Sequence, residues 1–405
     1  MINIKDRLDL IKQVGEEIIS EEELKALLKS GEELIAYDGF EPSGQIHIAQ
    51  GLVRAINVNK MIKAGVKFKM LVADWHALTN NKMGGDLEKI KTIGKYFIEV
   101  WRASGMDLDN VEFLWASDMV KDSNYWQLVI RVGMTNKLAR FIRTAEFMGR
   151  EDSAEQLTAA QIMYPCMQIA DIFRLGAKIT QLGMDQRKVN MLAREVGPQL
   201  GFWKPVVVSH HMLMGLQQVK SQKSKVKSKE NKEDKVVQLT KDQENFIYKD
   251  RKEYKPQYSG MFTSRKIQRT IELKMSKSNP DNAIFMTDTS QDIKRKINKA
   301  YCLEGDVKEN PVLEYCKYII FELFDRLRIN EFQIERPDKF GGSISFKTFS
   351  DLEKVFAQKQ VHPMDLKQTV IKYLDQLLEP VRRHFEENPE AKALLEKVKS
   401  YQVTR

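Results

Sequence analysis

Cysteine is scarce in this chain, and long apolar runs are missing from it. The three cysteines, Cys166, Cys302 and Cys316, lie far apart within 405 residues. They form neither a disulfide framework nor the paired spacing of a zinc site, which indicates a reducing compartment. No apolar run approaches the length of a membrane span, and the N-terminus lacks the apolar core of a signal peptide. We therefore expect a cytoplasmic protein with no membrane partner.

The composition is that of a globular protein with a surplus of positive charge. Hydrophobic residues make up 42% of the chain and charged residues 30%, which is enough apolar material for a core. The length exceeds that of one ordinary compact domain, so we expect two domains. The net charge of +9 favours a polyanionic partner such as nucleic acid, although a local lysine run would also raise it.

Such a lysine run lies between residues 217 and 245. Its centre, residues 220–235, has a single aliphatic residue among lysines, serines and acidic side chains. A segment of this kind buries too little apolar area to offset its chain entropy, so we predict a disordered insertion. Contact with nucleic acid phosphates is the alternative, and a solvated loop is favoured over it.

Apolar spacing predicts an α/β fold for the first two thirds of the chain. Residues 3–30 are expected to form an amphipathic helix. Short apolar strands then alternate with helical segments, which is typical of βαβ units and a parallel sheet. The expected strands are 34–37, 68–73, 111–115, 178–182 and 205–208, with helices from His47 onward, over 86–104 and over most of 123–175.

Ligands on a parallel sheet bind beyond the carboxyl ends of its strands. Tyr37, Ala73 and Leu182 lie at such ends. Helical spacing dominates after about residue 285, which predicts a domain boundary there. The expected helices of this second part are 290–300, 311–328 and 365–400.

The first segment with chemical potential is Glu41-Pro-Ser-Gly44-Gln-Ile-His47-Ile-Ala-Gln50, just after the first strand. A helix N-terminus attracts phosphate, and Gly44 lets the backbone approach a nucleotide closely. The His47 imidazole can donate a hydrogen bond to phosphorus oxygens as charge builds there. Read alone, the segment is more commonly explained by a buried histidine whose hydrogen bonds are satisfied.

The second segment is Lys274-Met-Ser-Lys277-Ser278. Attack on an α-phosphate with pyrophosphate leaving needs positioning and positive charge more than covalent help. Two lysines on a serine-containing loop supply that charge. Coincidence in a lysine-rich chain is the alternative, and the upstream histidine segment weakens it.

The two segments together resemble the signatures of the class I aminoacyl-tRNA synthetases. Among these, the chain is most similar to the tyrosyl-tRNA synthetases of archaea and the eukaryotic cytosol, over nearly its whole length outside the insertion. The tyrosine-specific part of the resemblance is Tyr164-Pro-Cys-Met-Gln168-Ile-Ala-Asp171 followed by Gly183-Met-Asp185-Gln186-Arg-Lys188. Tyr164, Gln168 and Asp171 stand four and three residues apart, so one helix face carries all three.

The resemblance implies roles for individual residues. Tyr37 and Asp171 would bind the phenol hydroxyl of tyrosine, and a pocket that hydrogen-bonds this hydroxyl rejects phenylalanine strongly. Tyr164, Gln168 and Gln186 would bind the substrate ammonium, and Ala73 and His76 would line the pocket. The residues that would bind ATP are Gly44, His47, Gln50, Asp185 and Lys277, and among them Asp185 would hold the ribose. The implied catalytic residues are His47, Lys274 and Lys277.

The family pattern often has histidine where this chain has Gln50, which can donate a hydrogen bond but cannot carry charge. In the second part of the chain, Phe340 matches a position that stacks on the first anticodon base, and His362 and Asp365 match positions around that base. Core packing is the alternative for Phe340. The basic residues Arg131, Lys137, Arg140 and Arg143 would meet the acceptor stem or form a solvated helix face.

The domain arrangement expected from this resemblance has three parts. Residues 1–34 form an N-terminal helical extension, 35–285 a Rossmann-like parallel-sheet catalytic domain, and 286–405 a helical anticodon-binding domain. The catalytic domain contains a helical connective segment at about 115–160, the lysine-rich insertion at about 217–245 and the lysine loop 274–278.

The implied reaction is activation of L-tyrosine by ATP, with Mg²⁺ accompanying the ATP, followed by transfer of tyrosine to the 3′ end of tRNA(Tyr). A homodimer is implied as well, with its interface near 115–160. Three alternatives remain open: a tryptophan-specific relative, a non-catalytic RNA-binding protein on the same scaffold, and a nucleotidyltransferase that does not use tRNA. The first alternative is disfavoured by the pair Tyr37 and Asp171, and the second by the intact lysine motif. The third is disfavoured by the Phe340–Asp365 region.

Overall fold

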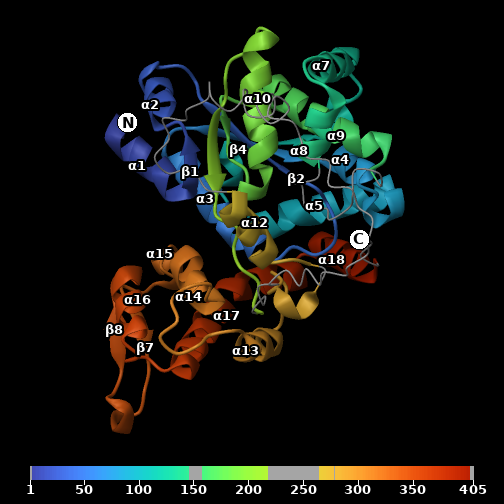
Figure 1. Ribbon diagram of the computed structural model, residues 1–405. Helices are drawn as coiled ribbons and strands as arrows, with labels where there is room; N and C mark the ends of the chain where they lie inside the picture. The colour runs from blue at the N-terminus through green and yellow to red at the C-terminus, as the bar shows by residue number, and fades with distance from the viewer. Residues whose placement is uncertain (1, 146–156, 218–263, 278, 402–405) are drawn as a thin grey trace, which may run out of the picture.

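A six-stranded sheet forms the centre of the larger part of the molecule (Figure 1). The computed structural model describes residues 2–145, 157–217, 264–277 and 279–401. The strand order is β1-β6-β5-β2-β3-β4, with β1 antiparallel to β6 and the other neighbours parallel. The strands are β1 (Gly15–Ile19), β2 (Ile35–Phe40), β3 (Lys67–Val72), β4 (Val111–Trp115), β5 (Ile179–Thr180) and β6 (Val206–His210). The predicted α/β class with a mainly parallel sheet is confirmed.

Helices cover both faces of this sheet, because successive side chains of a strand point to opposite sides. On β3, Phe68 and Met70 pack into one apolar cluster, while Leu71 packs into another. The first face is covered by α1 (Ile4–Val14), α3 (Arg54–Lys63) and α5 (Leu87–Ala103), and the second by α7 (Ser123–Met134), α9 (Ala159–Arg174) and α10 (Arg187–Gln199).

The expectation of one helix over residues 3–30 is wrong in its middle. The apolar spacing from Ile4 to Val14 does form α1, but Gly15 ends this helix, and β1 then pairs with the edge of β6. The β-branched pair Ile18 and Ile19 suits a strand. A new helix, α2 (Glu21–Lys29), begins with a capping box between Ser20 and Glu23.

The centre of the sheet contains the point at which the strand order reverses. From β2 the chain continues to β3 and β4 on one side, and later to β5 and β6 on the other. In an open parallel sheet, a crevice forms at the carboxyl ends of the strands at such a point. The end of β2, Tyr37 to Phe40, therefore leads directly into the site described below.

The remaining helices of the larger part are short. They are α4 (Asp74–Thr79), α6 (Ala116–Met119), α8 (Leu138–Ala145) and α12 (Ser264–Leu273). The predicted insertion at 217–245 lies outside the described residues, apart from Gln217. Residues 146–156 of the connective segment also lie outside them.

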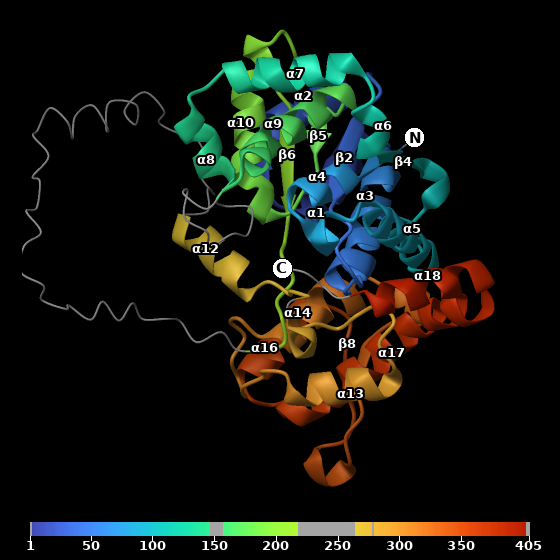
Figure 2. The ribbon, with the colours of Figure 1, turned by 90° about the vertical axis from the view of Figure 1, so that its right-hand side faces the viewer.

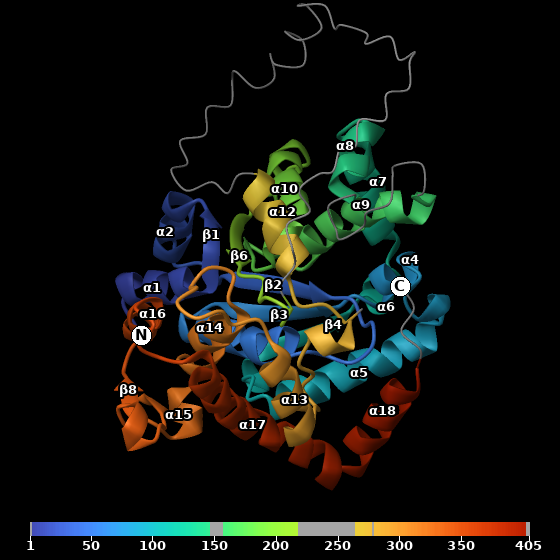
Figure 3. The ribbon, with the colours of Figure 1, turned by 60° about the horizontal axis from the view of Figure 1, so that its bottom comes forward.

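The C-terminal part is mainly helical and lies against the first face of the larger part, with α18 packed along α5 (Figures 2 and 3). The helix expected over 311–328 contains a π-helical turn at Cys316–Ile320 and is interrupted at residues 321–323. The helix expected over 365–400 is divided at Asn388, whose side chain caps α18. The elements are α13 (Ser290–Lys299), α14 (Pro311–Tyr315), α15 (Phe324–Leu327), the antiparallel pair β7 (Phe332–Ile334) and β8 (Ile344–Phe346), α16 (Phe349–Ala357), α17 (Pro363–Glu387) and α18 (Pro389–Ser400).

The two parts meet where the sequence predicts a domain boundary. The Ile48 N–H donates to the Ile284 carbonyl at 2.9 Å, and the Met286 N–H donates to the Ile46 carbonyl at 3.0 Å. One apolar cluster runs from the first face of the sheet into the C-terminal helices. The domain limits remain predictions. Within the described residues, no helix is both long and apolar enough to cross a bilayer.

The approach of α5 to the sheet leads to a first prediction. A Cβ atom on Gly94 would lie 2.7 Å from side-chain carbons of Val72 and Trp115, which belong to β3 and β4. Gly94→Ala should therefore lower the free energy of unfolding by about 1–2 kcal/mol, since overpacking outweighs the gain in helix propensity.

Urea unfolding followed by circular dichroism would measure this change. Gly133→Ala, in α7, is the matched control, because its Cβ would meet nothing nearer than the Cys166 sulfur at 3.9 Å. That variant should be neutral or up to about 1 kcal/mol more stable. Equal effects of the two substitutions would contradict the packing argument.

Candidate active site

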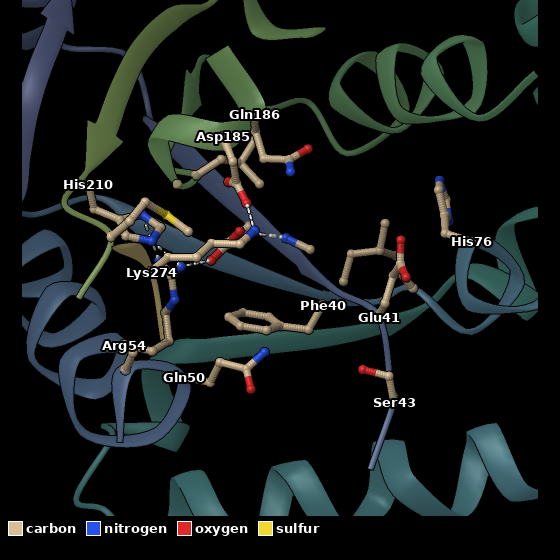
Figure 4. A pocket seen from close by; sticks show the side chains of 18 of the residues that line it. Phe40, Glu41, Ser43, Gln50, Arg54, His76, Asp185, Gln186, His210 and Lys274 are labelled. Carbon is tan, nitrogen blue, oxygen red and sulfur yellow. Dashed lines mark hydrogen bonds and ion pairs between the residues drawn. The ribbon is translucent and has the colours of Figure 1, made fainter. Parts of the chain in front are cut away.

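A pocket opens at the carboxyl ends of β2, β3 and β5 (Figure 4). Its wall is completed by α9, the turn 183–186 and the strand-like segment at Lys274 and Met275. Most residues predicted from the sequence to bind tyrosine or ATP line it: Tyr37, His47, Gln50, Ala73, His76, Tyr164, Gln168, Asp171, Asp185, Gln186 and Lys274. Gly44 and Lys277 do not line the pocket.

A buried carboxylate, Asp171, lies at the inner end of the pocket. Its two oxygens are engaged by different neighbours: the Tyr125 hydroxyl donates to Oδ1 at 2.9 Å, and His76 Nε2 lies 2.9 Å from Oδ2. Burial alone would lower the pKa of His76, but the Asp171 carboxylate outweighs it and raises that pKa. The imidazole and the hydroxyl therefore hold Asp171 as an oriented acceptor.

Tyr37 comes from β2 and is 1% exposed. Burial raises the pKa of its hydroxyl well above the usual value, and the nearby Asp171 and Asp38 carboxylates raise it further. The hydroxyl thus stays neutral. Tyr37 and Asp171 provide a neutral donor and an acceptor, which together match a phenolic hydroxyl.

A second polar group lies along α9. The Tyr164 hydroxyl donates to Glu41 Oε1 at 2.6 Å, and Gln168 Nε2 donates to Gln186 Oε1 at 3.2 Å. Asn80 holds the same Glu41 oxygen at 2.5 Å. A carboxylate with amide and hydroxyl oxygens beside it suits an ammonium group. Glu41 was not predicted as a site residue, because in the sequence it reads only as part of a turn.

The opposite side of the pocket carries His47 and Gln50. Burial lowers the pKa of His47 well below its usual value, and the charges of Lys277 and Lys274 lower it further. The imidazole is therefore neutral at pH 7. Among the described residues, neither His47 Nδ1 nor Gln50 Oε1 has a hydrogen-bond partner. Buried polar atoms of this kind are rare in folded proteins and indicate a place for a polar ligand.

Lys274 and Asp185, which both line the pocket, point toward one another (Figure 4). The Lys274 ammonium donates to Asp185 Oδ2 at 3.0 Å, and the Asp185 charge raises the pKa of Lys274. Lys274 is therefore a cation at neutral pH, and its present partner is the carboxylate predicted to hold a ribose.

The wall between these groups contains a buried ion pair that the sequence analysis missed. Arg54 Nη2 lies 2.6 Å from Asp38 Oδ2, and the guanidinium also donates to Gln181 at 2.8 Å and to His210 at 2.9 Å. The four residues come from segments far apart in the sequence, so no local spacing signals them. The described residues contain no group of three His, Cys, Asp or Glu side chains arranged to hold a metal ion.

Comparison with known proteins decides the family. The model of the class I tRNA synthetases for tryptophan and tyrosine matches residues 29–257 and 234–379. Tyrosine–tRNA ligase 1, cytoplasmic, of Arabidopsis thaliana is 45% identical, over 99% of this chain and 90% of its own length. The chain belongs to the tyrosyl-tRNA synthetase family.

Two archaeal proteins support the same assignment. The tyrosine–tRNA ligase of Thermococcus kodakarensis is 40% identical over 98% of this chain and 99% of its own. The tyrosyl-tRNA synthetase of Pyrococcus horikoshii, crystallised with L-tyrosine, is 34% identical with a TM-score of 0.80, over 98% and 100% of the two chains. The resemblance to the archaeal and eukaryotic cytosolic type is confirmed.

Lys277, the second lysine of the tyrosyl-tRNA synthetase motif, does not line the pocket. Its ammonium lies 4.8 Å from the centre of the Phe97 ring and has no hydrogen-bond partner among the described residues. Burial lowers the pKa of Lys277 to about 7, and the Lys82 charge contributes. Lys82 lines the pocket and adds a cation that the sequence analysis missed. Ser278 lies outside the described residues.

Gly44 has a φ of +99°, a conformation that glycine adopts without strain, and it shapes the turn before His47.

The residues predicted to bind the anticodon lie in the C-terminal part, away from the pocket. Phe340 is 62% exposed, which excludes core packing as its role, and His362 caps α17, whose first turn contains Asp365.

The basic residues predicted to meet the acceptor stem divide into two pairs. Arg140 is ion-paired with Glu195 at 2.9 Å, and Arg131 donates to the Leu200 carbonyl at 3.3 Å. Lys137 and Arg143 are exposed. The second pair is therefore the more available for a phosphate backbone.

The burial of Lys277 generates a second prediction. At pH 8 an amine with a pKa of about 7 is mostly neutral. A triphosphate beside it favours the charged form and raises the pKa. ATP binding at pH 8 should therefore take up protons, approaching about one per site.

Isothermal titration calorimetry in two buffers of different ionisation enthalpy measures this uptake. Lys277→Met should abolish it. Lys274→Met is the matched control and should retain the uptake, because Lys274 is already protonated before ATP binds. Heat that is independent of the buffer in the unmodified protein would disprove the prediction.

Proposed function

We propose that this chain is a tyrosine–tRNA ligase that activates L-tyrosine with ATP and transfers it to tRNA(Tyr). The observation that carries the proposal is a single pocket with an acceptor for a phenol at one end and cations for a triphosphate at the other. Asp171 lies at the first end, and Lys274 at the second. The curated relatives that carry the name tyrosine–tRNA ligase support tyrosine over tryptophan as the amino acid.

In this proposal, the substrate phenol donates to Asp171 and meets the Tyr37 hydroxyl. The oxygens of Asp171 already accept from Tyr125 and lie beside His76, so the carboxylate does not rotate when the substrate enters. Ala73 and His76 line the ring. Phenylalanine would leave buried polar groups unpaired, which is costly.

The substrate ammonium fits the group at the other end of α9. Tyr164, Gln168 and Gln186 offer a hydroxyl and two amide oxygens, as predicted from the sequence. Glu41, which accepts from Tyr164, adds the negative charge that neutralises the ammonium. This arrangement leaves the substrate carboxylate pointing toward the phosphate side of the pocket.

ATP would occupy the side formed by Gly44, His47 and Gln50, with its ribose on Asp185. The tyrosine carboxylate attacks the α-phosphorus of ATP. One carboxylate oxygen forms a new bond to this phosphorus, and the bond between the phosphorus and the leaving pyrophosphate breaks. Negative charge grows on the α-phosphate and on the leaving pyrophosphate. His47 donates to the former, and Lys274 and Lys277 neutralise the latter, so catalysis is positional and electrostatic.

Mg²⁺ would arrive on the ATP. This ion prefers phosphate oxygens and water to a cage made of protein side chains, so the triphosphate itself is its main ligand. The Asp185 carboxylate, which is paired with Lys274, is assigned to the ribose instead.

In the second step, a hydroxyl of the tRNA 3′-terminal ribose attacks the tyrosyl carbonyl, and AMP leaves. The exposed Phe340 would stack on the first anticodon base, with His362 and Asp365 around that base. Lys137 and Arg143 would meet the acceptor stem. The cytoplasmic name of the Arabidopsis relative supports a cytoplasmic location for this chain as well.

A homodimer is part of the proposal, with its interface on the connective segment. Large apolar side chains are exposed on adjacent helices of this segment and on the neighbouring α9, which is unusual for a solvent-facing surface. Ile130 and Met134 belong to α7, Leu138 to α8 and Met163 to α9, with exposed fractions of 60%, 79%, 60% and 41%.

Tyrosine-dependent ATP–pyrophosphate exchange on the purified protein tests the function. Exchange with tyrosine and charging of total tRNA are expected. Exchange with tryptophan instead would favour the tryptophan enzyme. Binding of tRNA without adenylate formation would indicate the non-catalytic RNA-binding protein, and adenylate formation without charging would indicate a nucleotidyltransferase.

Substitution of Asp171 tests the specificity mechanism. Asp171→Asn should reduce the preference for tyrosine over phenylalanine by about 10²- to 10³-fold in kcat/KM, because a charged acceptor for the phenol is lost. The KM for ATP should stay within about twofold. Tyr125→Phe should give a smaller loss, about tenfold, because His76 still holds the carboxylate. An unchanged preference in the Asp171 variant would refute the assignment.

The dimer has a separate test. Met134→Asp should produce a particle with the 47.0 kDa mass of one chain in light scattering, whereas the unmodified protein should have twice that mass. Leu303→Asp is the control, since Leu303 is 59% exposed in the C-terminal part, outside the proposed interface. It should remain a dimer. Dissociation by both substitutions would argue against this interface.

A further inference from the structure

Lys274 is held in place through its backbone. It forms an antiparallel bridge with Met214. The Gly215 N–H donates to the Leu273 carbonyl at 2.9 Å, and the Met275 N–H donates to the Leu213 carbonyl at 2.8 Å. The short segment 213–215 is thus the support on which the first lysine of the motif rests.

Side chains of the C-terminal part hold the segment 213–215 in place. The Met214 N–H donates to Glu314 Oε2 at 2.9 Å, and the Tyr315 hydroxyl donates to the Met214 carbonyl at 3.0 Å. Both residues belong to α14, and Tyr315 is fully buried. The backbone donor and acceptor of the residue opposite Lys274 are therefore fixed by two adjacent side chains of one helix.

His211 fixes Glu314 in turn. Its Nε2 lies 3.0 Å from Glu314 Oε1, and its Nδ1 lies 3.0 Å from Oε2 of Glu16, in β1. The imidazole also stacks on Tyr318 with 4.2 Å between the ring centres. Burial opposes the charge on this histidine, but the two carboxylates outweigh it and raise the pKa of His211 to about 9. At neutral pH the imidazolium thus lies between the two carboxylates and attracts both of them.

We propose that Glu314 and His211 are positioning residues for adenylate formation, which set the place of Lys274 through the backbone of Met214. The inference rests on the proposed function, because it assumes that Lys274 acts on the phosphates. A lysine ammonium reaches the pyrophosphate only from a suitable backbone position, and a shift of about 1 Å at a reacting group can cost about 10²-fold in rate. Glu314 and Tyr315 do not line the pocket, whereas His211 and Leu213 do.

Kinetics of pyrophosphate exchange test the proposal. Glu314→Gln keeps an oxygen for the Met214 N–H but loses the charge that holds His211. It should lower kcat about tenfold and leave the KM for tyrosine within about twofold. Glu99→Gln is the matched control: Glu99, in α5, lies 2.8 Å from His384, in α17, and so joins the same two parts of the molecule elsewhere. It should leave kcat unchanged. Equal losses in both variants would overturn the proposal, because they would indicate a general loosening of the two parts.

A double-mutant cycle separates the positioning role from a structural one. In a Lys274→Ala background, Glu314→Gln should add less than a twofold loss, since its effect passes through Lys274. Losses that multiply would overturn the inference. Tyr315→Phe, which removes a single hydroxyl, gives the same test if Glu314→Gln does not fold, and its loss too should vanish without Lys274.

The outcomes distinguish the inference from the function on which it rests. If Lys274→Ala alone retains full exchange activity, the role of Lys274 in the proposed function is wrong, and the inference falls with it. If Lys274→Ala is impaired but Glu314→Gln and Tyr315→Phe are not, only the inference is overturned.

Discussion

The pocket buries more charge than a protein interior can hold unpaired, and much of its architecture follows from how these charges are neutralised. Taking an ion out of water costs several kcal/mol unless a partner and further hydrogen bonds compensate. Asp38 is paired with Arg54, Asp171 with His76, and Lys274 with Asp185. Among the described residues, Lys277 is paired with no carboxylate, and burial lowers its pKa.

These pairs differ in how easily a substrate can replace them. The Asp38–Arg54 pair is enclosed by Gln181 and His210 and holds β2 to its surroundings, so it belongs to the scaffold. The Lys274–Asp185 pair lines the pocket and is partly exposed, and both partners are the residues expected to meet ATP. Phosphate groups can replace Asp185 as the partner of Lys274, while a ribose replaces Lys274 as the partner of Asp185. The free protein thus keeps its reactive charges balanced with the groups that later bind the substrate.

Much of the pocket was predictable from the sequence, for reasons that differ by residue. Tyr164, Gln168 and Asp171 share a helix face because of their spacing. Short apolar runs predict the strands that carry Tyr37 and precede Ala73, although β2 continues to Phe40, beyond its predicted end at Tyr37. Tyr125 was not predictable, because it reaches Asp171 from a separate helix with no motif around it. The strand β1 was missed because the helical spacing of α1 continues into it by chance, whereas its pairing with β6 depends on residues far along the chain.

The roles of the two signature segments also depend on contacts that no local pattern reveals. Backbone bonds join residues 46–48 to 284–286, and residues 213–215 to 273–275. The histidine segment and the lysine segment are therefore anchored to one frame by main-chain hydrogen bonds, while their side chains remain able to change partners. Main-chain hydrogen bonds do not involve the ligand, whereas a partly exposed ion pair in the pocket lining can exchange its partner for a substrate group. Because the main chain is fixed separately from the ion pairs, the cationic side chains can bind phosphates without displacing the strands that support them.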